Sequence, residues 1–197
     1  LHGTSASLHT WNGWAEALDD ERRVIRFDLP GFGLTGPYPG DDYSVARYRD
    51  FVLGMLDKLN LEQVVLAGNS FGGQLAWEAA VTEPERVGKL VLVDAAGYPL
   101  EPEDMPIGFR MAQLPGMKPV MSNLMPRSMI EQSVRQVYGD PSKVTEELVD
   151  RYYELTLREG NRAALFERFQ AGVSSKQPSR RLRQLEIPTL IIWGGED

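Results

Sequence analysis

The sequence predicts an α/β fold in which a mostly parallel sheet is flanked by helices and carries an inserted helical cap. Two patterns in the 197 residues lead to this fold class. Short segments rich in Val, Leu and Ile alternate with amphipathic helical segments, and strands that are apolar throughout are typical of a parallel sheet covered on both faces. Strand patterns then stop between Gly97 and Ser179 while helical patterns continue, which indicates an insertion of helices.

The first part of the chain predicts a helix, a strand, a loop and a second helix. Apolar side chains recur at helical spacing over residues 11–18, and "RVIRF" at 23–27 is a β-branched run that leads into the loop "DLPGFG". Within residues 43–61 apolar side chains again gather on one helical face. Ser44 is a suitable N-cap for this second helix, because its hydroxyl can accept from a free amide of the first turn.

Three further strands are predicted, each apolar and each ending in small residues. They are "QVVLAG" at 63–68, "VGKLVLVDAAG" at 87–97 and "IPTLIIWGG" at 187–195. A helix is expected from Phe71 to Thr82, halted near Pro84. The predicted domains are therefore a core of residues 1–97 and 180–197, and a helical cap of residues 98–179.

Methionine is concentrated in the first half of the predicted cap. Six of the seven methionines lie there, at Met105, Met111, Met117, Met121, Met125 and Met129. Because methionine is flexible, such a stretch is suited to line a pocket for apolar ligands, and it is equally suited to a loosely packed helical core.

Composition excludes several functional classes. The net charge of −7 argues against a nucleic-acid partner, which would require a basic face. The chain has no cysteine and only two histidines, so it predicts neither a disulfide framework nor a zinc centre. Its apolar runs are too short to cross a bilayer, and no leader precedes them. The expectation is a soluble, cytoplasmic protein.

The segment "VVLAGNSFGGQLAW" places one serine at an abrupt join. Gly68, Asn69, Ser70, Phe71 and Gly72 form a G-x-S-x-G motif directly after a buried strand and directly before a helix. Such a turn strains the serine backbone, holds its oxygen clear of neighbours, and points the free amides of the helix N-terminus at what the serine attacks. The flanking glycines leave the turn its space.

The sequence at this point resembles the α/β-hydrolase family, and the resemblance extends over almost the whole chain. Four segments carry it in the family's order: "LHGTSAS" at 1–7, "FDLPGFGLT" at 27–35, "GNSFGG" at 68–73 and "IPTLIIWGGED" at 187–197. They resemble the His-Gly loop, the glycine loop after the fourth strand, the nucleophile elbow, and the seventh strand with its acid-bearing turn. The helical insertion falls where this family carries its cap.

The resemblance implies roles for individual residues. Ser70 would be the nucleophile, with the backbone amides of Phe71 and Thr4 as the oxyanion hole. Asp197 would be the acid that orients a catalytic histidine, and Asp94 is the alternative acid because some members of the family keep theirs after the sixth strand.

Three other polar residues have structural interpretations. We expect Asp28 to bind backbone amides around "PGFG" and His2 to shape the oxyanion loop. His9 is assigned no chemistry.

One part of the family pattern is missing, because no histidine follows His9 in this chain. The family places its catalytic base after the acid, and its third strand between the fourth and the fifth. We therefore expect a chain truncated at both ends, with an unfilled slot in the sheet and no activity by itself.

The expected reaction is hydrolysis of small or medium carboxylic esters through an acyl-enzyme intermediate on Ser70. The alternatives within the family are carbon-carbon bond hydrolysis and removal of N-terminal proline. A non-catalytic ligand-binding protein on the same scaffold is the alternative from another class. The expected partner is a small-molecule acyl substrate, with no nucleic acid and no membrane. No metal or cofactor is implied, and the sequence leaves the oligomeric state open.

Overall fold

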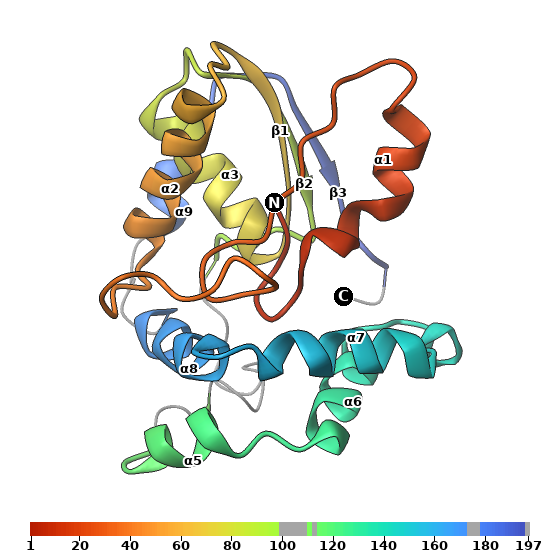
Figure 1. Cartoon of the computed structure of the whole chain (residues 1–197). Helices are drawn as coiled ribbons and strands as arrows, with labels where there is room; N and C mark the ends of the chain where they lie inside the picture. Colours follow the sequence, from red (N-terminus) through yellow and green to blue (C-terminus); the bar gives the residue numbers. More distant parts are fainter. Residues whose placement is uncertain (99–109, 112–113, 173–177, 196–197) are drawn as a thin grey trace.

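A computed structural model describes residues 1–98, 110–111, 114–172 and 178–195. At its centre is a parallel three-stranded sheet in the order β1-β2-β3 (Figure 1). β1 is Val64–Asn69, β2 is Val87–Val93 and β3 is Thr189–Ile192. Leu66 pairs with Leu90, and Leu92 pairs with Ile191, so all three strands end at the same edge of the sheet. β2 and β3 lie within the segments that the sequence predicts, and β1 extends one residue beyond its predicted segment, to Asn69.

The first crossover is the part of the molecule that positions the site. α3, Phe71–Thr82, begins two residues after β1 ends and is buried over most of its length. α2, Val45–Lys58, packs against α3. The side chain of Ser44 accepts a hydrogen bond from the Arg47 amide, so the expected N-cap is confirmed. Figure 1 shows α2 and α3 on one side of the strands and the N-terminal helix α1 on the other.

The N-terminal region confirms one expectation and contradicts another. The helix expected over residues 11–18 forms as α1, Asn12–Leu18, and a 3₁₀ turn, Leu8–Trp11, precedes it. The strand predicted at residues 23–27 does not form, and this prediction was wrong: the segment pairs with none of β1, β2 and β3.

The physical reason is the lack of a neighbouring strand. The main chain of Leu1 lies beside β1, where its carbonyl accepts from the Asn69 amide over 3.0 Å and its amino group donates to the Ala67 carbonyl. Val65 of β1 is 53% exposed, and Val24 and Ile25 are also exposed. A β-branched run becomes a strand only where another strand takes up its hydrogen bonds.

The described part of the segment predicted as a cap forms helices joined by turns and loops, and it contains no strand. Its elements are α5 Met117–Asn123, α6 Arg127–Gln136, the 3₁₀ turn Pro141–Lys143, α7 Glu146–Leu157, α8 Asn161–Gly172 and α9 Pro178–Leu182. α8 packs on α5 and α7, and α6 packs on α7. Figure 1 shows α5 to α8 as a layer apart from the sheet, while α9 lies beside α3. The domain boundaries at 98 and 179 stay a prediction.

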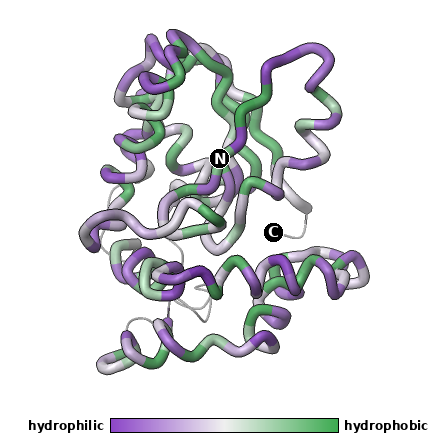
Figure 2. The backbone as a smooth tube through the Cα atoms, viewed as in Figure 1, coloured by the Kyte–Doolittle hydropathy of each residue, from purple (hydrophilic) through white to green (hydrophobic). Residues whose placement is uncertain are grey.

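Apolar side chains from both layers form one continuous core, which includes Leu75, Leu90 and Val149. Figure 2 shows hydrophobic residues along the strands and an alternation with hydrophilic ones in α6 and α7. Met121 and Met125 are buried in this core, which favours the packing interpretation of the methionines; Met105 lies outside the described residues. In the described part of the chain, no helix has both the length and the apolar character needed to cross a membrane.

Candidate active site

Ser70 occupies a strained backbone position between β1 and α3. Its φ of 50° and ψ of −118° lie outside the regions that L-residues ordinarily populate. Three backbone bonds hold it there: its amide donates to the Val93 carbonyl over 3.0 Å, and its carbonyl accepts from the amides of Gln74 and Ala96. The side chain of Ser70 is exposed, whereas Phe71 beside it is buried. The structure therefore presents one hydroxyl at the carboxyl edge of the sheet.

Both glycines of the motif are required by close backbone contacts. A Cβ atom at Gly68 would collide with the carbonyl group of Gly72. A Cβ atom at Gly72 would collide with the carbonyl oxygens of Leu1 and His2. The tight turn between β1 and α3 therefore requires glycine at both positions. The atoms that a Cβ would meet belong to the backbone, and they cannot move aside as a flexible side chain would.

The His-Gly loop lies directly against the serine. A Cβ atom at Gly3 would be 3.2 Å from the Cβ of Ser70 and 3.2 Å from Oδ1 of Asn69. Asn69 in turn donates from Nδ2 to the Val93 carbonyl over 3.2 Å, which connects the elbow to the end of β2. Thr4 follows Gly3, so the loop expected to provide one oxyanion amide is next to the expected nucleophile.

His2 is buried, and both of its ring nitrogens are in use. The Leu29 amide donates to Nε2 over 2.9 Å, and Nδ1 is 2.8 Å from the Gly3 carbonyl oxygen. Nε2 must therefore be the acceptor and Nδ1 the protonated donor. Burial lowers the pKa of His2 to about 4, so the ring is neutral at pH 7. This geometry matches the expected loop-shaping role and leaves no nitrogen free to act as a base for Ser70.

Asp28 organises the glycine loop, residues 28–36, as expected from the sequence. Its carboxylate accepts from the Leu8 amide over 2.7 Å and from the Leu34 amide over 2.9 Å. Its backbone carbonyl accepts from the Thr35 hydroxyl over 2.6 Å. The buried carboxylate thus joins the glycine loop to the 3₁₀ turn that begins at Leu8.

The two candidate acids differ in what the structure describes. Asp197 lies outside the described residues. Asp94 follows β2 with a φ of 44°, and its Oδ1 accepts from the Gly194 amide over 2.7 Å. That bond fixes the turn after β3.

The sequence reasoning missed Arg168, which lies on α8 above Phe71. Its side chain is 4% exposed, and its guanidinium carbon is 3.8 Å from the centre of the Phe71 ring. Burial lowers the pKa of Arg168 to about 10, so it remains a cation at pH 7. Its Nε and Nη1 are buried without a hydrogen-bond partner. An arginine among Leu165, Phe166 and Phe169 is the sequence signal that could have identified it.

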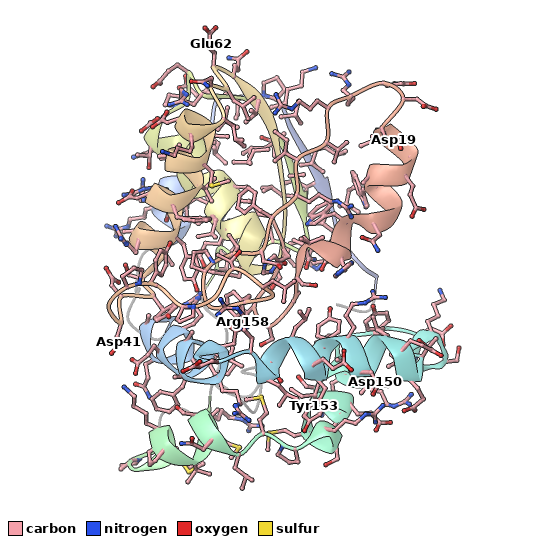
Figure 3. All side chains as sticks on the ribbon, viewed as in Figure 1. Asp19, Asp41, Glu62, Asp150, Tyr153 and Arg158 are labelled. Carbon is pink, nitrogen blue, oxygen red and sulfur yellow. The ribbon has the colours of Figure 1, made fainter. Side chains whose placement is uncertain are left out.

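Asn161 also escaped the sequence reasoning, although it connects the helical layer to the glycine loop. Its Nδ2 donates to the carbonyls of Gly33 and Leu155, each over 2.9 Å. A small cavity lies beside Asn161. It is lined by the His-Gly loop, the glycine loop, α7 and α8, including Ser5, Phe32 and Leu165. Figure 3 shows Arg158 at the same junction, where its guanidinium lies against Gly36.

The described residues contain no cluster of three or more His, Asp or Glu side chains that could hold a metal ion.

The chain is similar to known proteins over its whole length. A family model described as alpha/beta hydrolase fold matches residues 1–197. A 2-hydroxymuconate semialdehyde hydrolase from a Pseudomonas species is 31% identical over 208 residues, which cover 100% of this chain and 69% of the relative. A 2-hydroxy-6-oxo-2,4-heptadienoate hydrolase from Pseudomonas putida is 32% identical over 209 residues, with 100% and 70% covered.

Solved structures show the same likeness. A meta-cleavage product hydrolase from Pseudomonas fluorescens superimposes with a TM-score of 0.77 at 28% identity, covering 100% of this chain and 71% of that one. A putative epoxide hydrolase from Pseudomonas aeruginosa reaches a TM-score of 0.85 at 17% identity, covering 100% and 71%, and shows the fold alone. This chain therefore belongs to the α/β-hydrolase fold family.

Proposed function

We propose that this chain carries the nucleophile of a serine hydrolase that cleaves a carbon-carbon bond beside a ketone. The observation that carries the proposal is the exposed hydroxyl of Ser70 at a strained join, with Gly3 of the His-Gly loop packed against it. The reaction type is supported by two relatives that match the whole chain and are named as hydrolases of 2-hydroxymuconate semialdehyde and 2-hydroxy-6-oxo-2,4-heptadienoate. These relatives favour carbon-carbon cleavage over the ester hydrolysis expected first from the sequence.

The proposed chemistry proceeds through an acyl-enzyme. The Oγ of Ser70 adds to the carbonyl carbon, and the carbonyl oxygen becomes an oxyanion that accepts hydrogen bonds from the amides of Phe71 and Thr4. When the intermediate collapses, the bond between that carbon and its leaving group breaks, and the leaving carbon takes up a proton. Water then hydrolyses the acyl-serine and releases a carboxylic acid.

The serine requires a base, and we propose that this base is absent from the 197 residues. The chain has two histidines: both ring nitrogens of His2 are engaged, and His9 is exposed on the 3₁₀ turn. We propose Asp197 as the acid by its resemblance to the family, and Asp94, which accepts a hydrogen bond from the Gly194 amide, stays the alternative. The chain by itself is then expected to turn over no substrate.

Ester hydrolysis is the second candidate, and one sequence feature favours it. The loop "HGTSAS" has Thr4 and Ser5 where carbon-carbon hydrolases usually carry further glycines. The same elbow and oxyanion amides serve both reactions, since only the leaving group differs. A protein that binds a ligand without chemistry is the third candidate, and it predicts no turnover by either the protein or its Ser70→Ala variant.

The test compares the product of the whole gene with its Ser70→Ala variant on a set of substrates. The set contains a 2-hydroxy-6-oxo-dienoate, p-nitrophenyl butyrate and a proline amide. We expect the dienoate to give the highest kcat/KM. The kcat/KM of the Ser70→Ala variant for the dienoate should be at least about 1,000-fold lower, because removal of a catalytic serine from other serine hydrolases has an effect of this size or larger. Equal turnover by both proteins would eliminate Ser70 as nucleophile. A higher kcat/KM for the butyrate ester would replace the carbon-carbon reaction with ester hydrolysis.

A further inference from the structure

Arg168 is a buried cation for which the described residues provide no anion. Its guanidinium lies on the ring of Phe71, the residue after Ser70, and its side chain is 4% exposed. None of the ion pairs among the described residues includes it. By contrast, Arg181 is paired with Glu78, and Arg127 is paired with both Glu146 and Asp150.

The groups that face Arg168 do not neutralise it. The phenol of Tyr48 acts on it electrostatically, but burial raises the pKa of Tyr48, so the phenol is neutral at pH 7. The Tyr48 hydroxyl is also committed, because it donates to the Pro30 carbonyl over 2.7 Å. The face of the Phe71 ring attracts the cation but accepts no ordinary hydrogen bond. Two N–H donors, on Nε and Nη1, remain buried and unsatisfied.

We infer that Arg168 binds a carboxylate group of the substrate, held between α8 and the start of α3 beside Ser70. This inference rests on the proposed function. A buried charge without a partner is unfavourable, and a ligand of opposite charge that pairs with it offsets that cost. A guanidinium with free N–H groups pairs well with a planar carboxylate, and hydrogen bonds between opposite charges are the strong ones.

The location gives the pair a role in substrate selection. Phe71 is in contact with Arg168 through its ring and is the proposed source of an oxyanion amide through its backbone. A carboxylate held on Arg168 would fix one end of the substrate while its carbonyl lies at Ser70. A neutral substrate would leave the buried N–H groups unsatisfied, which is how a polar site rejects a ligand that lacks the matching group.

Binding is tested first, because it does not depend on turnover. Isothermal titration calorimetry and thermal unfolding of this chain are followed with butyrate, with its neutral counterpart butyramide, and with inorganic phosphate and chloride. We expect butyrate to bind and to raise the midpoint of unfolding, whereas butyramide does neither. Equal binding of butyramide, or no binding of butyrate, would overturn the inference. Phosphate or chloride binding as tightly as butyrate would overturn its assignment to a carboxylate.

Variants then assign the binding to Arg168. Arg168→Met removes the charge with little change in length and should weaken butyrate binding about 10- to 100-fold, the range for loss of charged hydrogen bonds. Arg180→Gln removes one charge from an exposed position on α9 and should bind butyrate as the unaltered chain does. Ser70→Ala should also bind butyrate.

If the methionine variant does not fold, Arg168→Lys replaces it. The lysine variant should bind butyrate about 10-fold more weakly than the unaltered chain, because an ammonium lacks the planar fork of a guanidinium. Unchanged binding by a folded variant would overturn the inference.

A kinetic comparison in the whole-gene product separates this inference from the proposed function. The readout is the ratio of kcat/KM for mono-p-nitrophenyl glutarate, which is anionic, to that for p-nitrophenyl butyrate, which is neutral. Arg168→Met should lower this ratio about 10-fold or more, mainly through KM for the glutarate. An unchanged ratio with turnover that still requires Ser70 would overturn the inference alone. Turnover that does not require Ser70 would overturn the proposed function and leave the titration to decide on Arg168.

Discussion

At the scale of single residues, the loops around Ser70 are held by buried polar side chains that bond to backbone amides. The roles of His2 and Asp28 could be predicted because each lies within a recognisable loop sequence. Their partners could not be predicted: Leu29 donates to His2 from 27 residues away. Arg168 was missed for the same reason, since its neighbour Phe71 is distant in sequence and only the fold brings them together.

The stability of the chain should depend on the protonation of His2. Burial lowers the pKa of His2 from 6.5 to about 4, so between these values the unfolded chain binds a proton that the folded chain does not. The free energy of unfolding should therefore fall as the pH drops from 6.5 to 4, by on the order of 3 kcal/mol. Urea denaturation across this pH range measures the effect.

Two histidine variants isolate that effect. His2→Gln should lose this part of the pH dependence, and His9→Gln should keep it because His9 is exposed. A profile with the same slope in the His2 variant would show that the titrating group lies elsewhere.

The elbow glycines should tolerate no side chain. Gly72→Ala places a Cβ against the carbonyl oxygens of Leu1 and His2, so we expect it to lower the free energy of unfolding by about 1–3 kcal/mol, as overpacking does. Gly54→Ala is the matched control. Gly54 lies in the middle of α2 and is exposed, and a Cβ there would meet nothing within 4 Å. It should raise stability by about 0.5–1 kcal/mol. Chemical denaturation compares the two, and equal effects would contradict the close contact at Gly72.

At the scale of elements, a helix or strand could be predicted from the sequence where its own residues determine whether it forms. The range expected for α3 is the observed one, Phe71–Thr82, because a strand, a small-residue turn and a helical pattern follow each other within a few residues. The segment 23–27 has an equally good local pattern and forms no strand, because pairing is a property of two segments. The helices of residues 114–172 were expected as a group, but their bounds and their packing on the glycine loop were not.

Asn161 should contribute much of the attachment between α8 and the glycine loop. Asn161→Ala removes the donors to the carbonyls of Gly33 and Leu155 and leaves two acceptors without them in a buried site. We expect a loss of about 1–3 kcal/mol in the free energy of unfolding. Asn123→Ala, whose amide bonds only within exposed α5, should change it by less than about 0.5 kcal/mol. A difference too small to measure between the two variants would mean that α8 is attached by its apolar contacts.

At the scale of the whole molecule, the sheet is buried at its central strand β2 and open at its edge strand β3. Val87 and Leu90 of β2 are inaccessible, while every residue of β3 is exposed, with Ile191 at 65%. The sequence predicted a strand here and predicted burial for it, because its apolar run is typical of a covered parallel strand. Burial depends on what lies over the strand, and the described residues place nothing over β3.

This open strand should make the isolated chain associate with itself. An exposed apolar strand at a sheet edge is a template for pairing with other chains. Ile191→Lys should therefore shift the chain toward the monomer in size-exclusion chromatography with light scattering. Leu157→Lys alters a single exposed apolar residue on α7 and should leave the distribution as it was. Identical distributions for the two variants would exclude β3 as the contact.

The three backbone bonds at residue 70 have a consequence for the variety of reactions that this framework can support. The amide and carbonyl of that residue are fixed by Val93, Gln74 and Ala96, and none of these bonds involves the hydroxyl. The backbone conformation of residue 70 is therefore set without its side chain. A thiol or a carboxylate at residue 70 would be held by the same three backbone bonds, so we expect a single substitution to change the nucleophile while the turn keeps its conformation.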